Sequence, residues 1–298
     1  MFRKSLVVFS ICTSLALAIS FASAGENPTG SNLSAAAIVE KNVAARGGLQ
    51  AWRAVQTMSM AGKMGAGGNQ RATVTVPNQG PVPSLKSLPQ RPVDEVQLPF
   101  VMELKRPRKM RVELLFNGQT AIQVFDGSNG WKLRPFLNRR EVEPYTPDEM
   151  KAASMQEDLD GPLVDYAAKG THVEMAGTEK VENRDNYKLK LTMKNGKSIN
   201  VWIDAQTFLE TKMEGQPRRL DGVYHPVEVY FRDYRAVNGL QIPFVLETKV
   251  LPVTSAGQRS VTPPVPVEKT IIEKVTVNPN LQESLFSKPD AGAASNVK

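Results

Sequence analysis

Alternation of apolar and polar residues across positions 103–131, ELKRPRKMRVELLFNGQTAIQVFDGSNGW, constrains the fold more than any other feature of the chain. Side chains of a strand alternate between its two faces, so one face of this stretch is apolar. That face holds Met110, Val112, Leu114 and Phe116. Asn117-Gly118 follows, a pair that favours a type I′ turn, and we expect the chain to return antiparallel through Ile122 and Val124. The stretch therefore predicts a hairpin with one apolar and one charged face.

The same alternation recurs on both sides of this hairpin. An apolar set at Leu98, Phe100, Met102 and Leu104 precedes it, and the breaks at Asp126-Gly127 and Asn129-Gly130 lead into a strand with Trp131 and Leu133. Beyond Gly170 the pattern continues at 187–193, 199–203, 209–213, 229–231, 242–246 and 271–277. Asn-Gly pairs at 117, 129, 195 and 238 stand between alternating runs. This repetition is typical of a mainly β fold with antiparallel strands.

Two stretches have helical rather than strand periodicity. Residues 33–46 carry apolar side chains near helical spacing, with Ser34 as the N-terminal cap and Gly47-Gly48 as the stop. Residues 147–169 form the second, with a break expected at Gly161-Pro162. Positions 64–99 are rich in glycine and proline, and proline removes the backbone donors that a sheet needs. We expect an irregular insertion there.

The first 24 residues predict an export signal. Arg3 and Lys4 precede an uncharged apolar run, and Ala22-Ser23-Ala24 is a cleavage pattern of small residues. The only cysteine of the chain is Cys12, so we expect a mature protein that is neither lipidated nor disulfide-bonded. The net charge of +7 stays positive without the two basic residues of the signal and identifies no partner by itself. We expect one domain over 25–287 and a disordered tail at 288–298.

The amount of apolar surface limits how the sheet can be arranged. About eight to ten strands offer roughly 30 large inward side chains, each worth about 1.5 to 3 kcal/mol when buried. A sheet of this length has to curl, and it can close into a filled barrel, split into a sandwich or wrap around helices. Two short helices would not fill a curved sheet, and the remaining hollow would suit a hydrocarbon ligand. The residues alone leave these arrangements open.

Several segments resemble the exported LolA/LolB-like group, the outer-membrane lipoprotein-sorting carriers. They are AIVE at 37–40 with RGGLQAW at 46–52, RPRKMR at 106–111 with DGSNGW at 126–131, VWIDAQTFLETKM at 201–213, DYRAVNGLQIP at 233–243 and NPNLQESLF at 278–286. The resemblance implies a single curved antiparallel sheet that forms an unclosed barrel, with a helical lid on its concave side. It also implies that the interior shelters acyl chains in the periplasm. The stretches at 64–99 and 255–266 depart from the compact carriers, which leaves the cargo open between lipoprotein and free lipid.

We predict that the inward faces of the strands line a lipid cavity and that the helix at 147–163 gates it. The predicted lining residues are Phe100, Met102, Leu104, Met110, Val112, Leu114, Phe116, Ile122, Val124, Trp131, Leu133, Met150, Met155, Leu159, Leu191, Met193, Val201, Ile203, Leu209, Met213, Val229 and Phe231. Methionine adapts to varied apolar shapes, although ordinary core packing explains the methionines and aromatic residues equally well. The basic cluster at 105–111 would meet lipid headgroups or an acidic partner, or form a solvated face. It lacks the interleaved aromatic residues of a nucleic-acid site.

The sequence contains no motif of a catalytic or metal site. Its histidines are His172 and His225, which we expect to be partly exposed strand residues. Gly127-Ser128-Asn129-Gly130 lacks the G-x-S-x-G spacing of a hydrolase, and the acidic residues at 158, 160 and 165 lack the spacing of a calcium loop. We expect no catalysis, no cofactor and no metal. A pair of catalytic carboxylates for glycoside hydrolysis stays an open alternative, because its two members can come from distant positions that sequence spacing does not relate.

The leading prediction is a periplasmic chaperone that carries lipoprotein acyl chains or other lipids between the inner and outer membranes. Its partners would be an inner-membrane donor complex and an outer-membrane acceptor. One alternative is a secreted hydrolase with dispersed acidic residues, which a pocket joining two carboxylates would favour. The other is a non-catalytic envelope scaffold with a filled barrel.

Overall fold

A computed structural model describes residues 33–66, 96–135, 139–154, 158–220, 223–253, 266–290 and 292 of the chain. The described residues from Ser34 onward belong to one compact unit. None of the helices within these ranges combines the length and the apolar character that crossing a bilayer requires. The predicted export signal with Cys12, and most of the predicted tail, lie outside the described residues.

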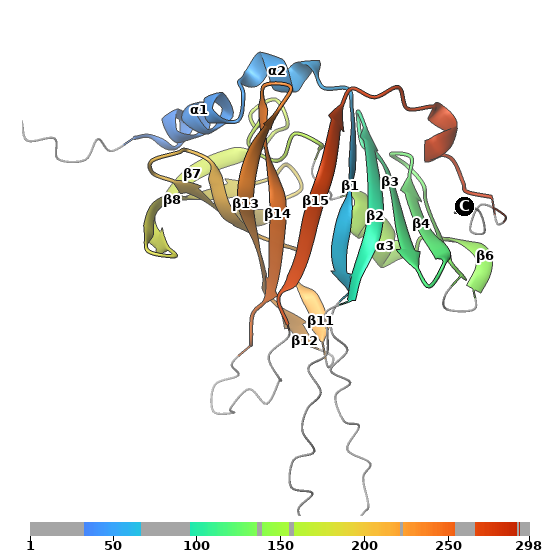
Figure 1. Ribbon diagram of the computed structural model, residues 1–298. Coiled ribbons are helices and arrows are strands. Elements are labelled where there is room, and N and C mark those ends of the chain that lie inside the picture. The colour runs from blue at the N-terminus through green and yellow to red at the C-terminus, as the bar shows by residue number, and fades with distance from the viewer. Residues whose placement is uncertain are drawn as a thin grey trace, which may run out of the picture. The chain divides into compact units, whose positions relative to one another are not determined.

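A single antiparallel sheet of 13 strands dominates this unit (Figure 1). The first six strands are β1 (Thr57–Ala66), β2 (Val96–Lys105), β3 (Lys109–Phe116), β4 (Gln119–Phe125), β5 (Gly130–Arg134) and β6 (Arg139–Pro144). The others are β7 (His172–Val181), β8 (Arg184–Thr192), β9 (Ser198–Asp204), β10 (Glu210–Glu214), β13 (Val227–Val237), β14 (Leu240–Val250) and β15 (Glu268–Val277). A separate two-stranded hairpin joins β11 (Arg218–Leu220) to β12 (Val223–His225).

The order of the strands is β6-β5-β4-β3-β2-β1-β15-β14-β13-β10-β9-β8-β7, so the sheet ends at β6 and β7 and is not closed. The predicted fold class, a mainly β chain with one unclosed antiparallel sheet, is confirmed. Both edge strands carry charged residues, such as Arg140 and Glu141 on β6 and Glu174 and Lys180 on β7. Charged edges oppose pairing with another chain, because a partner strand would have to desolvate them.

Three α-helices accompany the sheet within the described residues. α1 (Ala35–Ala45) starts at Ser34, whose hydroxyl accepts a hydrogen bond from the backbone N–H of Ala37, as predicted. Gly47 and Gly48 end it with φ of 114° and 94°. The short α2 (Leu49–Ala54) follows at once and was not predicted. Beyond it, β1 reaches Ala66 and β2 starts at Val96, so strands occupy both ends of the predicted insertion, and positions 67–95 lie outside the described residues.

α3 (Pro147–Ser154) is shorter than predicted. Its start has reciprocal capping, since Thr146 Oγ1 accepts from the Glu149 N–H at 3.3 Å and Glu149 Oε2 accepts from the Thr146 N–H at 2.7 Å. Residues 158–170 form turns instead of the predicted helix. The reason is backbone conformation, because Gly161 and Asp165 have φ of 79° and 52°, which an α-helix does not tolerate. α3 lies behind β1 to β4 in Figure 1.

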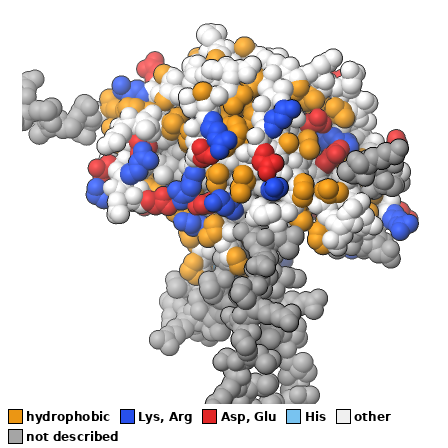
Figure 2. All heavy atoms as spheres, in the orientation of Figure 1, with side chains coloured by type: hydrophobic (Ala, Val, Ile, Leu, Met, Phe, Trp, Pro, Cys, Tyr) orange, Lys and Arg blue, Asp and Glu red, His pale blue; other side chains and the backbone are white. Residues whose placement is uncertain are grey.

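The register of the strands assigns each side chain to one of two faces. We call the face with Met58, Leu104 and Met110 the inner face, because these residues pair directly across β1, β2 and β3. Ala153 of α3 lines a small gap together with Leu104, Met110 and Phe125, so α3 lies on the side of the inner face. The opposite face, the outer face, carries basic and acidic side chains that alternate with short apolar stretches in Figure 2.

Four of the predicted inward residues lie on the outer face. They are Ile122, Val124, Trp131 and Leu133, and this placement corrects the prediction. Phe116 pairs with Gln119 across the two-residue turn, so even positions of β3 oppose odd positions of β4. Ile122 therefore pairs with Glu113, and Ala121 and Phe125 are the residues of β4 that turn inward.

A second apolar cluster covers this part of the outer face. The 3₁₀ helix η2 (Glu283–Phe286) places Phe286, 1% exposed, against Ile122, Val124 and Leu133. Lys105 and Lys109 hold Glu283 of the same turn at 2.6 Å each, and these bonds lower the pKa of Glu283 to about 2. Residues 283–286 thus pack as part of the fold on the outer face, apart from the inner face.

Candidate functional site

A cavity of about 430 Å³ lies on the inner face, in the middle of the sheet. Its apolar lining comes from β1, β2, β9, β10, β13, β14 and β15 and from the residues just after α3. It includes Met58, Met60, Leu104, Leu159, Pro162, Val201, Met213, Phe231, Ile242, Pro243, Leu246 and Ile272, and Trp52 of α2 adds to it. The volume falls within the roughly 300–1,000 Å³ typical of small-molecule sites. The helices therefore leave an apolar space beneath them, where the sheet does not fill its own interior.

Five of the predicted residues line this cavity: Leu104, Leu159, Val201, Met213 and Phe231. Nine others share the inner face by register but lie outside the lining. These are Phe100, Met102, Met110, Val112, Leu114, Phe116, Leu191, Ile203 and Val229. Phe100, Leu191 and Ile203 are buried, so they contribute to packing instead.

The remaining predicted residues lie apart from the cavity. Leu209 borders a neighbouring cavity of about 310 Å³ that also contains Asp204 and Arg232. Met193 borders a further cavity of about 440 Å³, which shares Gly161 and Pro162 with the main cavity. Met150 is half-buried on α3, and Met155 lies outside the described residues.

Several lining residues were missed by the sequence prediction. Met58 and Met60 alternate on β1, and Ile242 and Leu246 belong to an alternating run on β14, so a signal was present for each. Trp52 of α2 could not be assigned, because only the tertiary structure brings that helix over the sheet.

One end of the cavity is polar. Arg46 Nη1 lies 3.3 Å from Glu210 Oε1, and Tyr234 donates its hydroxyl to Glu210 Oε2 at 3.1 Å. Arg46 also stacks over the ring of Trp52, at 4.5 Å from its centroid. Burial, together with the charge of Glu210, raises the pKa of Tyr234 well above its ordinary value, so its hydroxyl stays protonated. All of these residues line the cavity.

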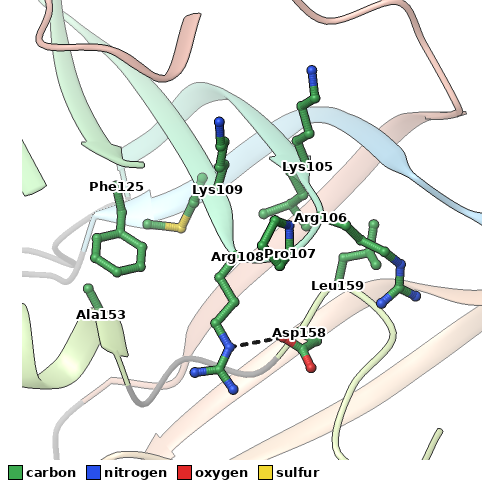
Figure 3. Close-up of a pocket in the computed structure, with 11 residues that line it drawn as sticks. Lys105, Arg106, Pro107, Arg108, Lys109, Phe125, Ala153, Asp158 and Leu159 are labelled. Atoms are coloured by element: carbon green, nitrogen blue, oxygen red, sulfur yellow. Dashed lines mark hydrogen bonds and ion pairs between the residues drawn. The ribbon is translucent and has the colours of Figure 1, made fainter. Parts of the chain in front are cut away.

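Residues 158–170, which we call the cover segment, lie over the cavity and contribute Asp158, Leu159, Gly161 and Pro162 to its lining. Figure 3 shows how the start of this segment meets the turn between β2 and β3, with Arg108 Nε donating to Asp158 Oδ1 at 3.2 Å. The gap left between them, about 20 Å³, is only large enough for water. Leu163 and Val164 of the segment are fully buried.

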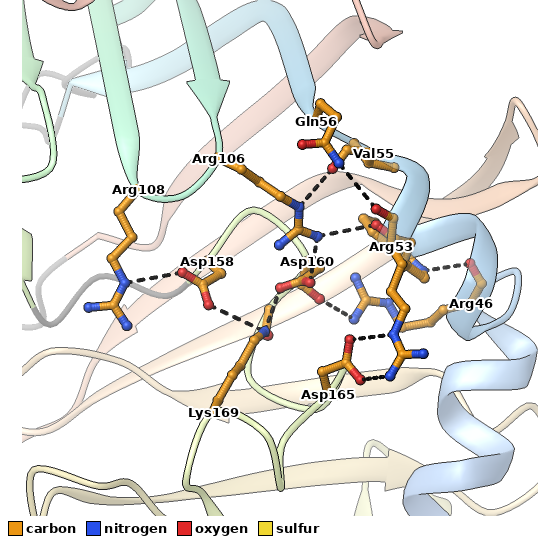
Figure 4. A network of polar contacts seen from close by, with 12 residues as sticks. Arg46, Arg53, Val55, Gln56, Arg106, Arg108, Asp158, Asp160, Asp165 and Lys169 are labelled. Atoms are coloured by element: carbon orange, nitrogen blue, oxygen red, sulfur yellow. Dashed lines mark hydrogen bonds and ion pairs between the residues drawn. The ribbon is translucent and has the colours of Figure 1, made fainter.

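Asp160 is the centre of the contacts that hold the cover segment (Figure 4). Its carboxylate, 2% exposed, accepts from Arg106 Nη2 at 2.7 Å and from Lys169 Nζ at 2.5 Å. Its backbone carbonyl accepts from Arg46 Nη1 at 2.9 Å. Charge-assisted hydrogen bonds of this kind are the stronger ones in proteins, and here they tie the segment to α1 and to β2.

A second ion pair fixes the far part of the cover segment. Arg53 of α2 donates to both carboxylate oxygens of Asp165, at 2.9 and 2.6 Å (Figure 4). Hydrogen bonding to Arg53 lowers the pKa of Asp165. The Arg53 side chain is 50% exposed, so this pair contributes less than the pairs of Asp160. The cover segment is therefore held by polar contacts at both ends.

Within the described residues, no group of three or more His, Cys, Asp or Glu side chains is arranged to hold a metal ion. His172 is exposed, in agreement with the sequence prediction. His225 is buried instead, with Nδ1 3.1 Å from the Leu251 carbonyl, because the β11–β12 hairpin folds back onto the end of β14.

Three solved structures align with most of this chain. An outer membrane lipoprotein-sorting protein domain from Vibrio parahaemolyticus aligns over 88% of this chain and 98% of its own, with 11% identity and a TM-score of 0.50. A DUF1329 family protein from Desulfovibrio piger aligns over 88% and 99%, with 13% identity and a TM-score of 0.51. A LolA superfamily protein from Nitrosomonas europaea aligns over 86% and 98%, with 12% identity and a TM-score of 0.48.

The fold is LolA-like. The resemblance seen in the sequence is thereby confirmed at the level of the fold. A scan against protein-family models and a search of curated proteins gave no match. In this LolA-like unit the apolar cavity lies between the sheet and the cover segment, on the side that α3 also covers.

Proposed function

We propose that this protein is a non-catalytic carrier that binds the acyl chains of a lipoprotein or of another lipid in its inner cavity. The observation that carries the proposal is the apolar cavity of about 430 Å³ beneath a cover segment held by ion pairs. Burial of apolar surface is worth roughly 25 cal/mol per Å², so an acyl chain in this cavity would be bound by the hydrophobic effect without covalent chemistry.

The LolA-like fold supports the same proposal. A structural relative is named for outer membrane lipoprotein sorting, and the first 24 residues of this chain have the pattern of an export signal. The proposed site of action is therefore the periplasm. The proposed partners are an inner-membrane complex that supplies the cargo and an outer-membrane acceptor that takes it.

The cover segment has the features of a gate. Leu159 and Pro162 face the cavity, ion pairs join the segment to Arg53 of α2 and to Arg106 at the end of β2, and Arg46 at the end of α1 donates a hydrogen bond to its backbone. Release of these pairs would open the cavity without disturbing the strands, whose hydrogen bonds run elsewhere. Cargo would leave when an acceptor offers a better apolar site, because a ligand shifts an equilibrium only by its difference in affinity.

The test is to purify the exported protein from periplasm and to identify co-extracted lipids by mass spectrometry. We expect lipid or acylated peptide at a fixed ratio to protein. Met213→Trp places a large ring in the cavity and should lower that ratio several-fold. Met175→Trp is the matched control, because Met175 is 39% exposed on β7 and does not line the cavity.

Two results would overturn the proposal. One is the absence of any bound lipid from protein whose circular dichroism shows an intact β fold. The other is an equal loss of lipid in the Met213 and Met175 variants, which would indicate binding on the surface.

A further inference from the structure

A second cavity, of about 440 Å³, lies on the other side of the cover segment. It shares Asp158, Gly161 and Pro162 with the apolar cavity, so these residues form a common wall. We call this second cavity the vestibule. Its remaining lining is mixed: Arg108 comes from the turn between β2 and β3, Ser154 from α3, Lys169 and Thr171 from the end of the cover segment and just after it, and Met193, Lys194 and Asn195 from the turn between β8 and β9.

The vestibule has an excess of positive charge. Arg108, Lys169 and Lys194 line it, and Asp158 is the acidic residue among its lining. Arg108 Nε is 3.2 Å from Asp158, and Lys169 Nζ is 3.5 Å from Asp158 and 2.5 Å from Asp160, so both of these cations have carboxylate partners (Figure 4). Lys194 is exposed and forms no ion pair with any residue that the structure describes.

Lys197, from the same turn, lines the apolar cavity itself. It also lacks an ion pair within the described part of the chain, and the carboxylates of that cavity have other partners. Glu210 faces Arg46, and Glu214 accepts from the N–H and side-chain amide of Asn200 at 2.8 and 2.9 Å. Two lysines without carboxylate partners therefore stand on either side of the common wall.

The turn that carries these lysines is well defined. The Met193 N–H donates to the Lys197 carbonyl and the Gly196 N–H to the Met193 carbonyl, both at 2.8 Å. The Asn195 side chain accepts from the Lys197 N–H at 3.0 Å. The bases of the two side chains are thereby fixed at the rim, and their ammonium groups are the parts that can adapt to a ligand.

We propose that the cargo is an anionic amphiphile, whose acyl chain occupies the apolar cavity and whose phosphate or carboxylate headgroup binds at the common wall, through Lys194 and Arg108 of the vestibule and Lys197 of the apolar cavity. The proposal rests on the proposed function and adds the chemical class of the ligand. A neutral hydrocarbon cargo would gain nothing from unpaired lysines at this rim, whereas an anionic headgroup would supply the missing countercharge.

The experiment measures transfer of pyrene-labelled phosphatidylglycerol and phosphatidylcholine with identical acyl chains from vesicles to the full mature protein. The variant is K194Q/K197Q. The matched control is K274Q/K288Q, which removes two exposed lysines away from both cavities. A third arm adds inorganic phosphate in excess, against sodium chloride at the same ionic strength.

We expect the natural protein to prefer phosphatidylglycerol about five- to tenfold, since each lysine near an anionic lipid is worth about fivefold and salt screens part of this. The preference should fall below about twofold in K194Q/K197Q and stay unchanged in the control. Binding of phosphatidylcholine should be equal in all three proteins, because it depends on the acyl chain.

Equal binding of the two lipids by the natural protein, or a preference that survives in K194Q/K197Q, would overturn the headgroup proposal and leave the carrier function standing. Stronger competition by phosphate than by sodium chloride, without loss of phosphatidylcholine binding, supports a shared phosphate site. Binding of phosphate with no effect on either lipid would mean a site for a soluble anion and would also overturn the proposal. If neither lipid binds, the proposed carrier function fails with it.

Discussion

Replacement of Asp160 by alanine should release the cover segment while the sheet stays folded. The change removes the acceptor of Arg106 Nη2 and of Lys169 Nζ, which lie 2.7 and 2.5 Å from the carboxylate. Breaking a buried ion pair costs about 3–5 kcal/mol. The side chains of Arg106 and Lys169 are 24% and 20% exposed, so water can solvate them after the change. We therefore take the lower end of the range, about 3 kcal/mol, as the free energy that the closed segment loses.

A loss of about 3 kcal/mol raises the population of the open segment roughly 100-fold, since each 1.4 kcal/mol is a factor of ten. Hydrogen exchange read by mass spectrometry measures this opening. The informative amides are those of Lys169 and Thr171, which donate to the carbonyls of Asp165 and Tyr166 at 3.0 and 2.8 Å. Their exchange should become about 100-fold faster, and release of a fluorescent fatty acid from the cavity should become faster with it.

The control is Asp185→Ala, which removes an exposed carboxylate paired with the exposed Lys180 and should change exchange by less than about threefold. Unchanged exchange of the cover segment in the Asp160 variant would refute the central role of this carboxylate. Equally faster exchange in β13 and β14 would refute the idea that the segment opens separately from the sheet.

Three further predictions follow from the contacts described above. Phe286→Ala should lower the free energy of unfolding by about 3–5 kcal/mol, seen as a lower Tm, yet leave acyl-probe binding intact because Phe286, 1% exposed, packs on the outer face. Gly47→Ala should cost about 2 kcal/mol or more in urea unfolding, since φ is 114° and a Cβ would lie 2.4 Å from the Gly239 carbonyl oxygen. The Arg53–Asp165 pair should stabilise the cover segment fully above pH 3.8, the ordinary pKa of the carboxyl, and this contribution should disappear as pH falls through the lowered folded pKa. Hydrogen exchange against pH should show the loss, and Arg53→Gln should lack this part of the dependence.

The local patterns of the sequence predict the elements of this fold well. Ser34 and Gly47-Gly48 place α1 within two residues at its start and one at its end, because capping depends on neighbouring residues only. Asn117-Gly118 and Asn238-Gly239 correctly predict the tight turns between β3 and β4 and between β13 and β14.

Assignment of side chains to the two faces was less successful. Phe116 and Gln119 flank a two-residue turn, so even-numbered residues of β3 share a face with odd-numbered residues of β4. This register alone places Ile122 and Val124 on the face that Met110 does not share. The information was therefore present in the sequence, but the pattern of apolar residues concealed it, because both faces of β4 are buried by different parts of the chain.

The contacts of the cover segment were beyond sequence analysis. Arg106 and Asp160 are 54 positions apart, and Arg46 and Asp160 are 114 apart. No local rule relates such residues, and acidic side chains in this stretch equally fit a solvated helix.

The position of β15 has a consequence for how the protein comes together. This last strand enters between β1 and β14, and its absence would leave those two strands with bare hydrogen-bonding edges. A chain that stops before Glu268 would consist of two half-sheets, each able to pair with a second copy. Completion of the sheet must therefore wait for residues near the C-terminus, and such sequence-distant pairing makes folding slow. Synthesis of the chain through β15 would thus precede the moment at which the interior is first enclosed.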